Sequence, residues 1–537
     1  MIPLPDLQCI CIAVILKLTI AEEYSIKRND PRLPIHGTKN WKFVGGSKFS
    51  PRHSHATCIF KCPDNSNESC IWLTGGYSES HRTFDVEFME NESSDVWWSR
   101  NGADWNQVTK LYGDFLQGIG NGDALDGGYV APWYSRYGHS FHALDGDGDR
   151  ISDVMVLAGG FSPLPSNDVW ISQDGITWRF DGFAPWPKRA YHGAAIFQGK
   201  LWIMGGSPLS NDAWVGTLVE DTSRDVGYKL LWEQVLSPNE APWTPRAGFC
   251  AITQHRQYPL PEPSDTNFNL TEASYNEILF IIGGLAVSGD VPSDGTRTRN
   301  DVWKTIDGVA WEKVSPSSGQ TMPWGGRAFH GCVTLHSLQD RTRWVGYDFE
   351  NVKLADDRGV GNKTVPRMFI TGGGYMGSKG NNHVRELEAY TDTWWSHDGA
   401  DWARINYEEG SKHDDNLYST QEWTETNIEG RTLYRGKWGH SVESFFLQKS
   451  EEDSDQQSEI AYSIDACSSS KKQTAACKKL LESTIPTLLV IGGKLDSMMM
   501  VNDVFVSKPG VHCETDGITC NGNGICGPGT QGCSLPQ

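Results

Sequence analysis

The carboxylates of residues 145–153 have a spacing that suits a hard metal ion. The segment reads Asp145-Gly146-Asp147-Gly148-Asp149-Arg150-Ile151-Ser152-Asp153, which places acidic side chains at its first, third, fifth and ninth positions. Such side chains converge on one cation when the glycines between them let the backbone turn. We predict a structural Ca²⁺ site formed by Asp145, Asp147, Asp149 and Asp153. The alternative is a solvated acidic hairpin turn. Nothing in the sequence indicates an organic cofactor.

A second set of residues combines tryptophan with a basic residue. Ala-Pro-Trp or Met-Pro-Trp segments place a tryptophan three residues before an arginine, as in Trp133 and Arg136. Aromatic faces and guanidinium groups suit sugars or anionic ligands. The residues that we predict to bind a ligand are Trp133, Arg136, Trp186, Arg189, Trp243, Arg246, Trp324, Arg327 and Trp438. The alternative is structural, with tryptophans wedged between repeated units and arginines bonded to neighbouring turns.

The sequence has no pattern typical of a catalytic centre. A nucleophile elbow, a phosphate-binding loop and zinc-ligand spacings are all missing. We therefore assign no catalytic residue, and the sequence favours a protein without catalytic activity. An isomerase that needs a single acid or base would leave no motif, so an enzyme stays open.

These residues belong to six copies of one repeat. Each copy has a glycine pair after an apolar run: Gly75-Gly76, Gly159-Gly160, Gly205-Gly206, Gly283-Gly284, Gly372-Gly373 and Gly492-Gly493. An Asp-x-aromatic step follows each pair, and a basic residue precedes it, usually with histidine three residues later. Each copy predicts four short strands, and such sheets bury both faces when they pack radially. The sixth copy lacks its last strand, which residues 40–44 are expected to supply.

The glycine pairs and spaced aromatic residues resemble the kelch-repeat β-propeller family. The resemblance implies an all-β fold, a six-bladed kelch-type propeller over residues 38–508 whose last blade is closed by an N-terminal strand. Kelch propellers serve many unrelated functions, so the fold implies little about activity. Members that act on carbohydrate include galactose-oxidase-like copper enzymes and a sialic-acid mutarotase. The acidic segment is similar to the calcium loops of integrin-type propellers, with Arg150 where those loops usually carry glycine.

The ends of the chain and its cysteines indicate the secretory pathway. Residues 1–21 fit a signal peptide with an apolar centre, and residues 511–537 resemble part of an EGF-like module. Close cysteine spacing predicts disulfides among Cys62, Cys70, Cys467, Cys477, Cys513, Cys520, Cys526 and Cys533. Cys58, Cys250 and Cys332 remain, so we expect at least one free thiol. The N-glycosylation acceptors are Asn67, Asn91, Asn269 and Asn362.

Composition limits the classes of partner. With 47 basic and 67 acidic residues the net charge is −20, which disfavours nucleic acid. No membrane span is expected, and the oligomeric state stays open. We predict a secreted or lumenal recognition scaffold whose partner is a glycan or a glycoprotein. The alternatives are a carbohydrate-active enzyme of the two types named above and a structural protein of the cell surface or matrix.

Overall fold

The structure is a computed structural model of the whole chain. It describes residues 41–64, 69–78, 93–108, 131–147, 152–162, 164–223, 227–255, 277–286, 297–319, 321–335, 367–376, 387–390, 392–396, 398–404, 424–425, 433–434, 437–448, 484–495 and 500–507. These residues form strands and turns and no helix. Within them, therefore, no apolar helix of membrane-spanning length occurs.

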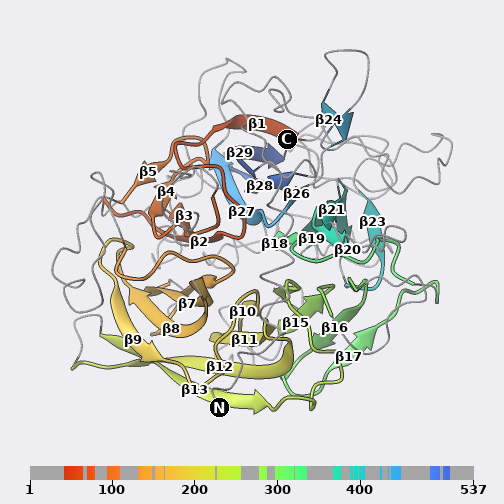
Figure 1. Ribbon diagram of the computed structural model, residues 1–537, viewed down its shortest axis with the longest axis horizontal. Coiled ribbons are helices and arrows are strands. Elements are labelled where there is room, and N and C mark those ends of the chain that lie inside the picture. Colours follow the sequence, from red (N-terminus) through yellow and green to blue (C-terminus); the bar gives the residue numbers. More distant parts are fainter. Residues whose placement is uncertain are drawn as a thin grey trace, which may run out of the picture.

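Six antiparallel sheets surround a common axis (Figure 1) and form a six-bladed β-propeller. Blade 1 contains β2 (Ala56–Lys61), β3 (Ser69–Thr74), β4 (Val96–Ser99) and β5 (Asn106–Gln107). Blade 2 contains β6 (Ser140–Leu144), β7 (Val154–Ser162), β8 (Leu164–Ser172) and β9 (Arg179–Phe183). Blade 3 contains β10 (Gly193–Phe197), β11 (Lys200–Gly206), β12 (Ser210–Glu220) and β13 (Tyr228–Leu236).

The second half of the ring repeats this order. Blade 4 contains β14 (Cys250–His255), β15 (Glu277–Ile282), β16 (Val302–Thr305) and β17 (Glu312–Val314). Blade 5 contains β18 (Gly331–Leu335), β19 (Arg367–Thr371), β22 (Thr393–Ser396) and β23 (Trp402–Arg404). Blade 6 contains β27 (Ser441–Gln448), β28 (Thr484–Leu495), β29 (Met500–Ser507) and β1 (Trp41–Gly46), with β26 (Lys437–Trp438) also paired to β28. Two small hairpins complete the strands: β20 (Gly374–Met376) with β21 (Leu387–Ala389), and β24 (Thr424–Glu425) with β25 (Leu433–Tyr434).

The last blade is closed by the N-terminal strand, as the sequence predicts. Strand β1 pairs antiparallel with β29, and Trp41 lies opposite Ser507. This pairing covers an edge of β29 that would otherwise present unpaired backbone groups to solvent. The all-β, six-bladed fold and its mode of closure are therefore confirmed.

The core lies between the blades, because each sheet is apolar on both faces. The second strands are the most buried, and Ile71, Trp72 and Leu73 of β3 are fully enclosed. Ile71 packs against Leu489 of blade 6, whereas Trp72 packs against Met155 of blade 2. A strand buried on both sides reads as a continuous apolar run, which explains the run before each glycine pair.

Each glycine pair joins one blade to the next. Gly75 and Gly76 have φ of 59° and 108°, values that favour glycine. A Cβ at Gly75 would lie 2.6 Å from the Arg136 carbonyl oxygen. The second glycine of every pair donates its N–H to the carbonyl of the next basic landmark, in a closed ring of six bonds of 2.7–2.9 Å from Gly76, Gly160, Gly206, Gly284, Gly373 and Gly493. Each glycine pair therefore links its own blade to the next one by a backbone hydrogen bond.

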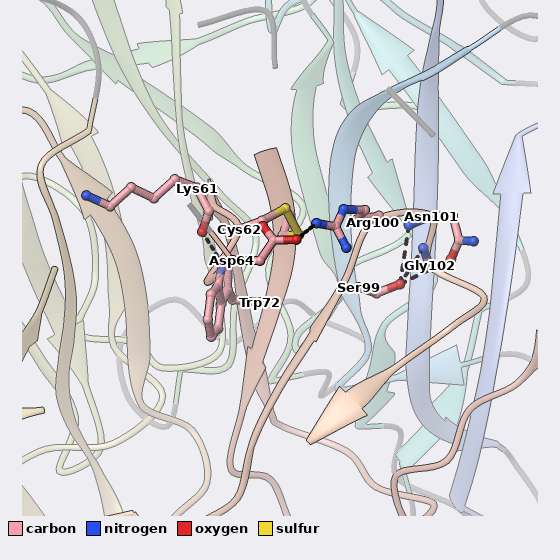
Figure 2. The surroundings of a disulfide bond; sticks show 9 residues. Lys61, Cys62, Asp64, Trp72, Ser99, Arg100, Asn101 and Gly102 are labelled. Carbon is pink, nitrogen blue, oxygen red and sulfur yellow. Dashed lines mark hydrogen bonds and ion pairs between the residues drawn. A yellow bond between two sulfur atoms is a disulfide. The ribbon is translucent and has the colours of Figure 1, made fainter. Parts of the chain in front are cut away.

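Two disulfides link neighbouring segments of the propeller. Figure 2 shows the Cys62–Cys70 bond, which confirms the predicted pair, beside the ion pair of Asp64 with Arg100. The second bond joins Cys250 of blade 4 to Cys332 of blade 5. Cys58 is free and buried, as expected for one leftover thiol.

Several predicted features lie outside the described residues. They are the signal peptide, the C-terminal module with its four cysteines, Cys467 and Cys477, and the four acceptors Asn67, Asn91, Asn269 and Asn362. They stay predictions.

Candidate functional site

The predicted arginines lie beneath the surface of the propeller, each bound to an aspartate of its own blade. Arg189 donates from Nη1 and Nη2 to the two carboxylate oxygens of Asp212 at 2.8 and 2.7 Å, and from Nη1 to the Gly205 carbonyl at 2.8 Å. The Trp214 indole N–H donates to the same carboxylate at 2.8 Å. Arg52, Arg136, Arg246 and Arg327 repeat this arrangement with Asp95, Asp168, Asp301 and Asp392.

These contacts set the charge state of the aspartates. Burial alone would raise the pKa of Asp212, but hydrogen bonds and the charge of Arg189 hold it below its usual range. The pKa values of Asp168 and Asp301 are lowered by their arginines in the same way. The guanidinium N–H groups in these bonds point to acceptors inside the protein. The arginine–aspartate pairs therefore stabilise the structure just beneath the surface.

The predicted tryptophans are also buried. Trp133, Trp186, Trp243 and Trp324 are at most 3% exposed, and each packs edge-on against a second tryptophan, with ring centroids 4.8–6.1 Å apart. This geometry corresponds to the structural alternative, in which the tryptophans are wedged between the repeated units. A direct role of these residues and their arginines in ligand binding stays a prediction. Trp438, the ninth residue of the set, lies in the feature described next.

Six aromatic side chains form a closed collar around the axis, on the face that carries the glycine pairs. Going round, the collar contains His53, Tyr77, Tyr137, Tyr191, Phe329 and Trp438, and neighbouring ring centroids lie 4.7–6.0 Å apart. Phe161 extends it, 5.2 Å from Tyr137. The faces of Tyr77, Phe161 and Phe329 are half-buried, and the other rings are buried. The innermost strands of blades 1, 3, 5 and 6 converge on this centre (Figure 1).

The backbone beneath the collar fixes the rings in place. In each blade, the residue just before the histidine of the repeat (Phe249 in blade 4) donates its backbone N–H to the carbonyl of the equivalent residue in the preceding blade. These six bonds of 2.6–2.8 Å form a second closed ring through Ser54, Gly138, Tyr191, Gly248, Phe329 and Gly439. Tyr191 and Phe329 have φ of 55° and 56°, an unfavourable region for bulky residues that persists only where surrounding contacts impose it. Gly138 accommodates the Tyr191 ring, since a Cβ there would lie 2.9 Å from it.

Sequence reasoning found only Trp438 of the collar. A usable signal was present, because the residue after each basic landmark is aromatic in three consecutive blades, at Trp438, His53 and Tyr137. The equivalent residue is Ala190, Ala247 or Ala328 in the other three. The repeat is therefore asymmetric at this position beside the axis.

The acidic segment forms the hairpin between β6 and β7. Ligand atoms of Asp145, Asp147 and Asp153 lie within 4.8 Å of one another, which fits a hard cation. Asp149 lies outside the described residues. The Asp153 carboxylate accepts the Gly146 N–H at 2.7 Å. Burial and the charges of Asp153 and Asp147 raise the pKa of Tyr228, on blade 3, to about 12. The Ca²⁺ assignment stays a prediction.

Titratable side chains also border the axis below the collar. Glu443 of β27 is half-buried and accepts the Thr57 hydroxyl at 2.6 Å. Burial raises the pKa of Glu443 to about 7, and the Thr57 hydrogen bond opposes this shift. His142, on the innermost strand of blade 2, has its pKa lowered to about 4 by burial. A carboxyl that titrates near neutrality is typical of functional sites.

Comparison with known proteins assigns the chain to no family. No family model matches the chain, and no curated protein matches it. Among solved structures, one titled "Structure of YjhT" has 12% sequence identity and a TM-score of 0.41. The match covers 86% of this chain and 96% of that chain.

Proposed function

We propose that the chain is a non-catalytic recognition protein that binds the carbohydrate of a glycan or glycoprotein at the aromatic collar. The observation that carries the proposal is the collar itself. Its half-buried faces, Tyr77, Phe161 and Phe329, offer apolar surfaces of the size on which sugar rings stack. Tyrosine and histidine at the same mouth add polar groups, which give a mostly apolar site its orientation.

The location of the site agrees with this function. Long connections leave the blades on the collar face, such as the one from Tyr77 to β4 and the one from Leu285 to β16. Loops on a rigid scaffold commonly carry specificity. The two disulfides are compatible with an oxidising compartment, so we place the protein outside the cell or in a lumen.

The test is binding of the secreted full-length protein to a broad glycan array. We expect discrete hits, and the Tyr77→Ala and Phe161→Ala variants should bind the same glycans about tenfold more weakly or worse. Phe183→Ala is the matched control, because Phe183 is an aromatic residue on β9 that is 70% exposed and outside the collar. A blank array, or equal losses in all three variants, would overturn the proposal.

The same preparation separates the two alternatives. A galactose-oxidase-like enzyme would contain copper and show a radical absorption band. A mutarotase would speed the interconversion of the anomers of a bound sugar. A structural surface or matrix protein would self-associate with rising concentration and bind no soluble glycan. The recognition proposal expects a protein without copper or turnover that binds discrete glycans.

A further inference from the structure

The seam between the first and last blades carries a column of contacts that runs from the collar into the axis. From the collar downward these are the His53–Trp438 ring pair at 4.7 Å, the Ser54 N–H to Gly439 carbonyl bond at 2.6 Å, the His55 Nε2 to Ser441 Oγ contact at 3.0 Å and the Thr57 to Glu443 bond at 2.6 Å. All of them join the β2 segment to the β27 segment. A change at the bottom of this column therefore acts on the same two strands that hold part of the collar.

Glu443 is the one carboxyl in this column. Thr57 is the only described partner of its side chain, and Thr57 brings no charge. The groups that face it from β2 are His55, whose pKa burial lowers to about 3, and the Cys58 thiol, whose pKa burial raises. His440, just before β27, also has its pKa lowered to about 3 by burial. All three are uncharged at neutral pH.

The other neighbours of Glu443 carry no charge either. Strand β18, which packs against β27, carries the uncharged residues Cys332, Val333 and Thr334, and the described side chains of β28 opposite Glu443 are apolar. An ionised carboxylate here therefore has one described hydroxyl, only partial exposure to solvent and no described cation. Ionisation in such surroundings costs more than in water.

We propose that ionisation of Glu443 loosens the seam between blades 6 and 1 and weakens ligand binding at the collar. The seam is then more stable, and the collar binds its ligand more tightly, in weakly acidic solution than in alkaline solution. The binding half of this inference rests on the proposed function, whereas the seam half does not. The direction is opposite to that of the buried histidines, which destabilise the fold in acid.

The seam can be measured without a ligand, because each of the six seams has one equivalent backbone N–H. The Ser54 amide reports the seam with Glu443, and the Tyr191 and Phe329 amides report two other seams. We expect the Ser54 protection factor, corrected for intrinsic exchange and read by site-resolving mass spectrometry, to fall about tenfold from pH 6 to pH 8. Tyr191 and Phe329 should not follow.

Three variants separate the switch from general instability. Glu443→Gln should abolish the fall in Ser54 protection between pH 6 and pH 8. Thr57→Val removes the bond that favours the ionised form, so the transition should move to higher pH. Glu277→Gln is the matched control, since Glu277 is a carboxyl at another seam whose pKa is also raised by burial. Equal pH profiles in the wild type and Glu443→Gln would overturn the proposal.

Glycan affinity measured at the same two pH values tests the coupling. We expect weaker binding at pH 8 in the wild type and no change in Glu443→Gln. A seam that responds to pH beside an affinity that does not would overturn the coupling to the collar. If no glycan binds at either pH while Ser54 still responds, the proposed function fails and the seam switch is supported.

Discussion

At the level of single residues, the arginine–aspartate pairs combine an ion pair with several hydrogen bonds below the surface. Arg189 and Asp212 are 2% and 1% exposed, and the carboxylate also accepts from Ser210 and Trp214. A buried pair of this kind stabilises little in total, because desolvation offsets much of the attraction. Loss of one partner is costly, however, because the other is left charged and buried.

Arg189→Met should therefore lower the free energy of unfolding by about 3–5 kcal/mol. The reason is that Asp212 loses both guanidinium bonds while it stays enclosed. The double variant Arg189→Met with Asp212→Leu should recover part of this loss. Denaturant unfolding followed by tryptophan fluorescence measures all three proteins.

An exposed ion pair provides the comparison for this prediction. Lys304 and Glu312 lie 3.5 Å apart, and Glu312 is 73% exposed. Lys304→Met should cost less than about 1 kcal/mol, because water screens such pairs. If Arg189→Met cost no more than Lys304→Met, the buried pairs would not hold the blades in the way described.

The sequence shows both members of each pair but not the bond between them. Arg136 and Asp168 are 32 residues apart, and Arg327 and Asp392 are 65 apart. The separation varies because the connections between strands vary in length. Only the antiparallel order of the strands brings the start of the first strand beside the start of the third. Without that geometry, the repeated spacing of tryptophan and arginine indicates a ligand site, which stays a prediction.

At the level of elements, the β6–β7 hairpin connects a candidate ion site to the next blade. A Cβ at Gly146 would lie 2.5 Å from the Tyr228 ring, so the hairpin packs closely on β13. Three carboxylates repel one another here unless a cation neutralises them. Ion binding would therefore stabilise both the hairpin and its contact with blade 3.

We predict that Ca²⁺ raises the midpoint of thermal unfolding and that EDTA reverses the rise, since a ligand bound only to the folded state stabilises it. Ca²⁺ should also lower the pKa of Tyr228 from about 12, because the ion neutralises Asp153 and Asp147. Calorimetry and a tyrosine absorbance titration measure these effects. Asp147→Asn should abolish them, and Asp221→Asn, in the β12–β13 connection, should not. A Ca²⁺ response that survives Asp147→Asn would place the ion elsewhere.

The elements themselves are the part of the fold most readily predicted from the sequence. Apolar runs, glycine pairs and Asp-Gly turns specify strand order locally, so six blades and the closing strand follow from spacing alone. The Cys250–Cys332 bond does not follow from local spacing, because its cysteines are 82 residues apart in different blades. Aligning the repeats places the two near the starts of adjacent innermost strands, which is the signal that finds the bond.

At the scale of the whole molecule, the ring brings six strand starts to one axis. The collar depends on this convergence, since its rings come from blades 1, 2, 3, 5 and 6, and no single position of the repeat supplies them all. The same convergence brings seven histidines near the axis, of which His142 is half-buried and the others are buried: His53, His55, His139, His142, His192, His330 and His440. Burial lowers the pKa of each, so the folded protein holds them neutral.

This arrangement makes the whole propeller sensitive to acid. In the unfolded chain each histidine titrates near its ordinary pKa of about 6.5, whereas in the fold the pKa is far lower. The stabilisation is therefore complete above pH 6.5 and is lost as the pH falls toward the folded values. Each fully buried histidine contributes roughly 1.4 kcal/mol per pH unit below that point. Unfolding should become steeply easier between pH 6.5 and 4.

His192→Phe tests this at one site, because blade 4 already carries Phe249 at the equivalent position. Neither ring nitrogen of His192 has a hydrogen-bond partner among the described residues, and burial followed by the charge of Arg189 lowers its pKa to about 3. The variant should be at least as stable as the wild type at pH 7.5. It should lose less stability on acidification, because one fewer side chain takes up a proton on unfolding. The slope of the unfolding free energy against pH, measured by denaturant unfolding at several pH values, should fall by about 1.4 kcal/mol per pH unit.

His139→Phe differs, because the Thr74 hydroxyl bonded to His139 at 2.8 Å loses its partner and stability falls at neutral pH as well. Parallel acid curves for His192→Phe and the wild type would show that His192 titrates normally in the folded protein.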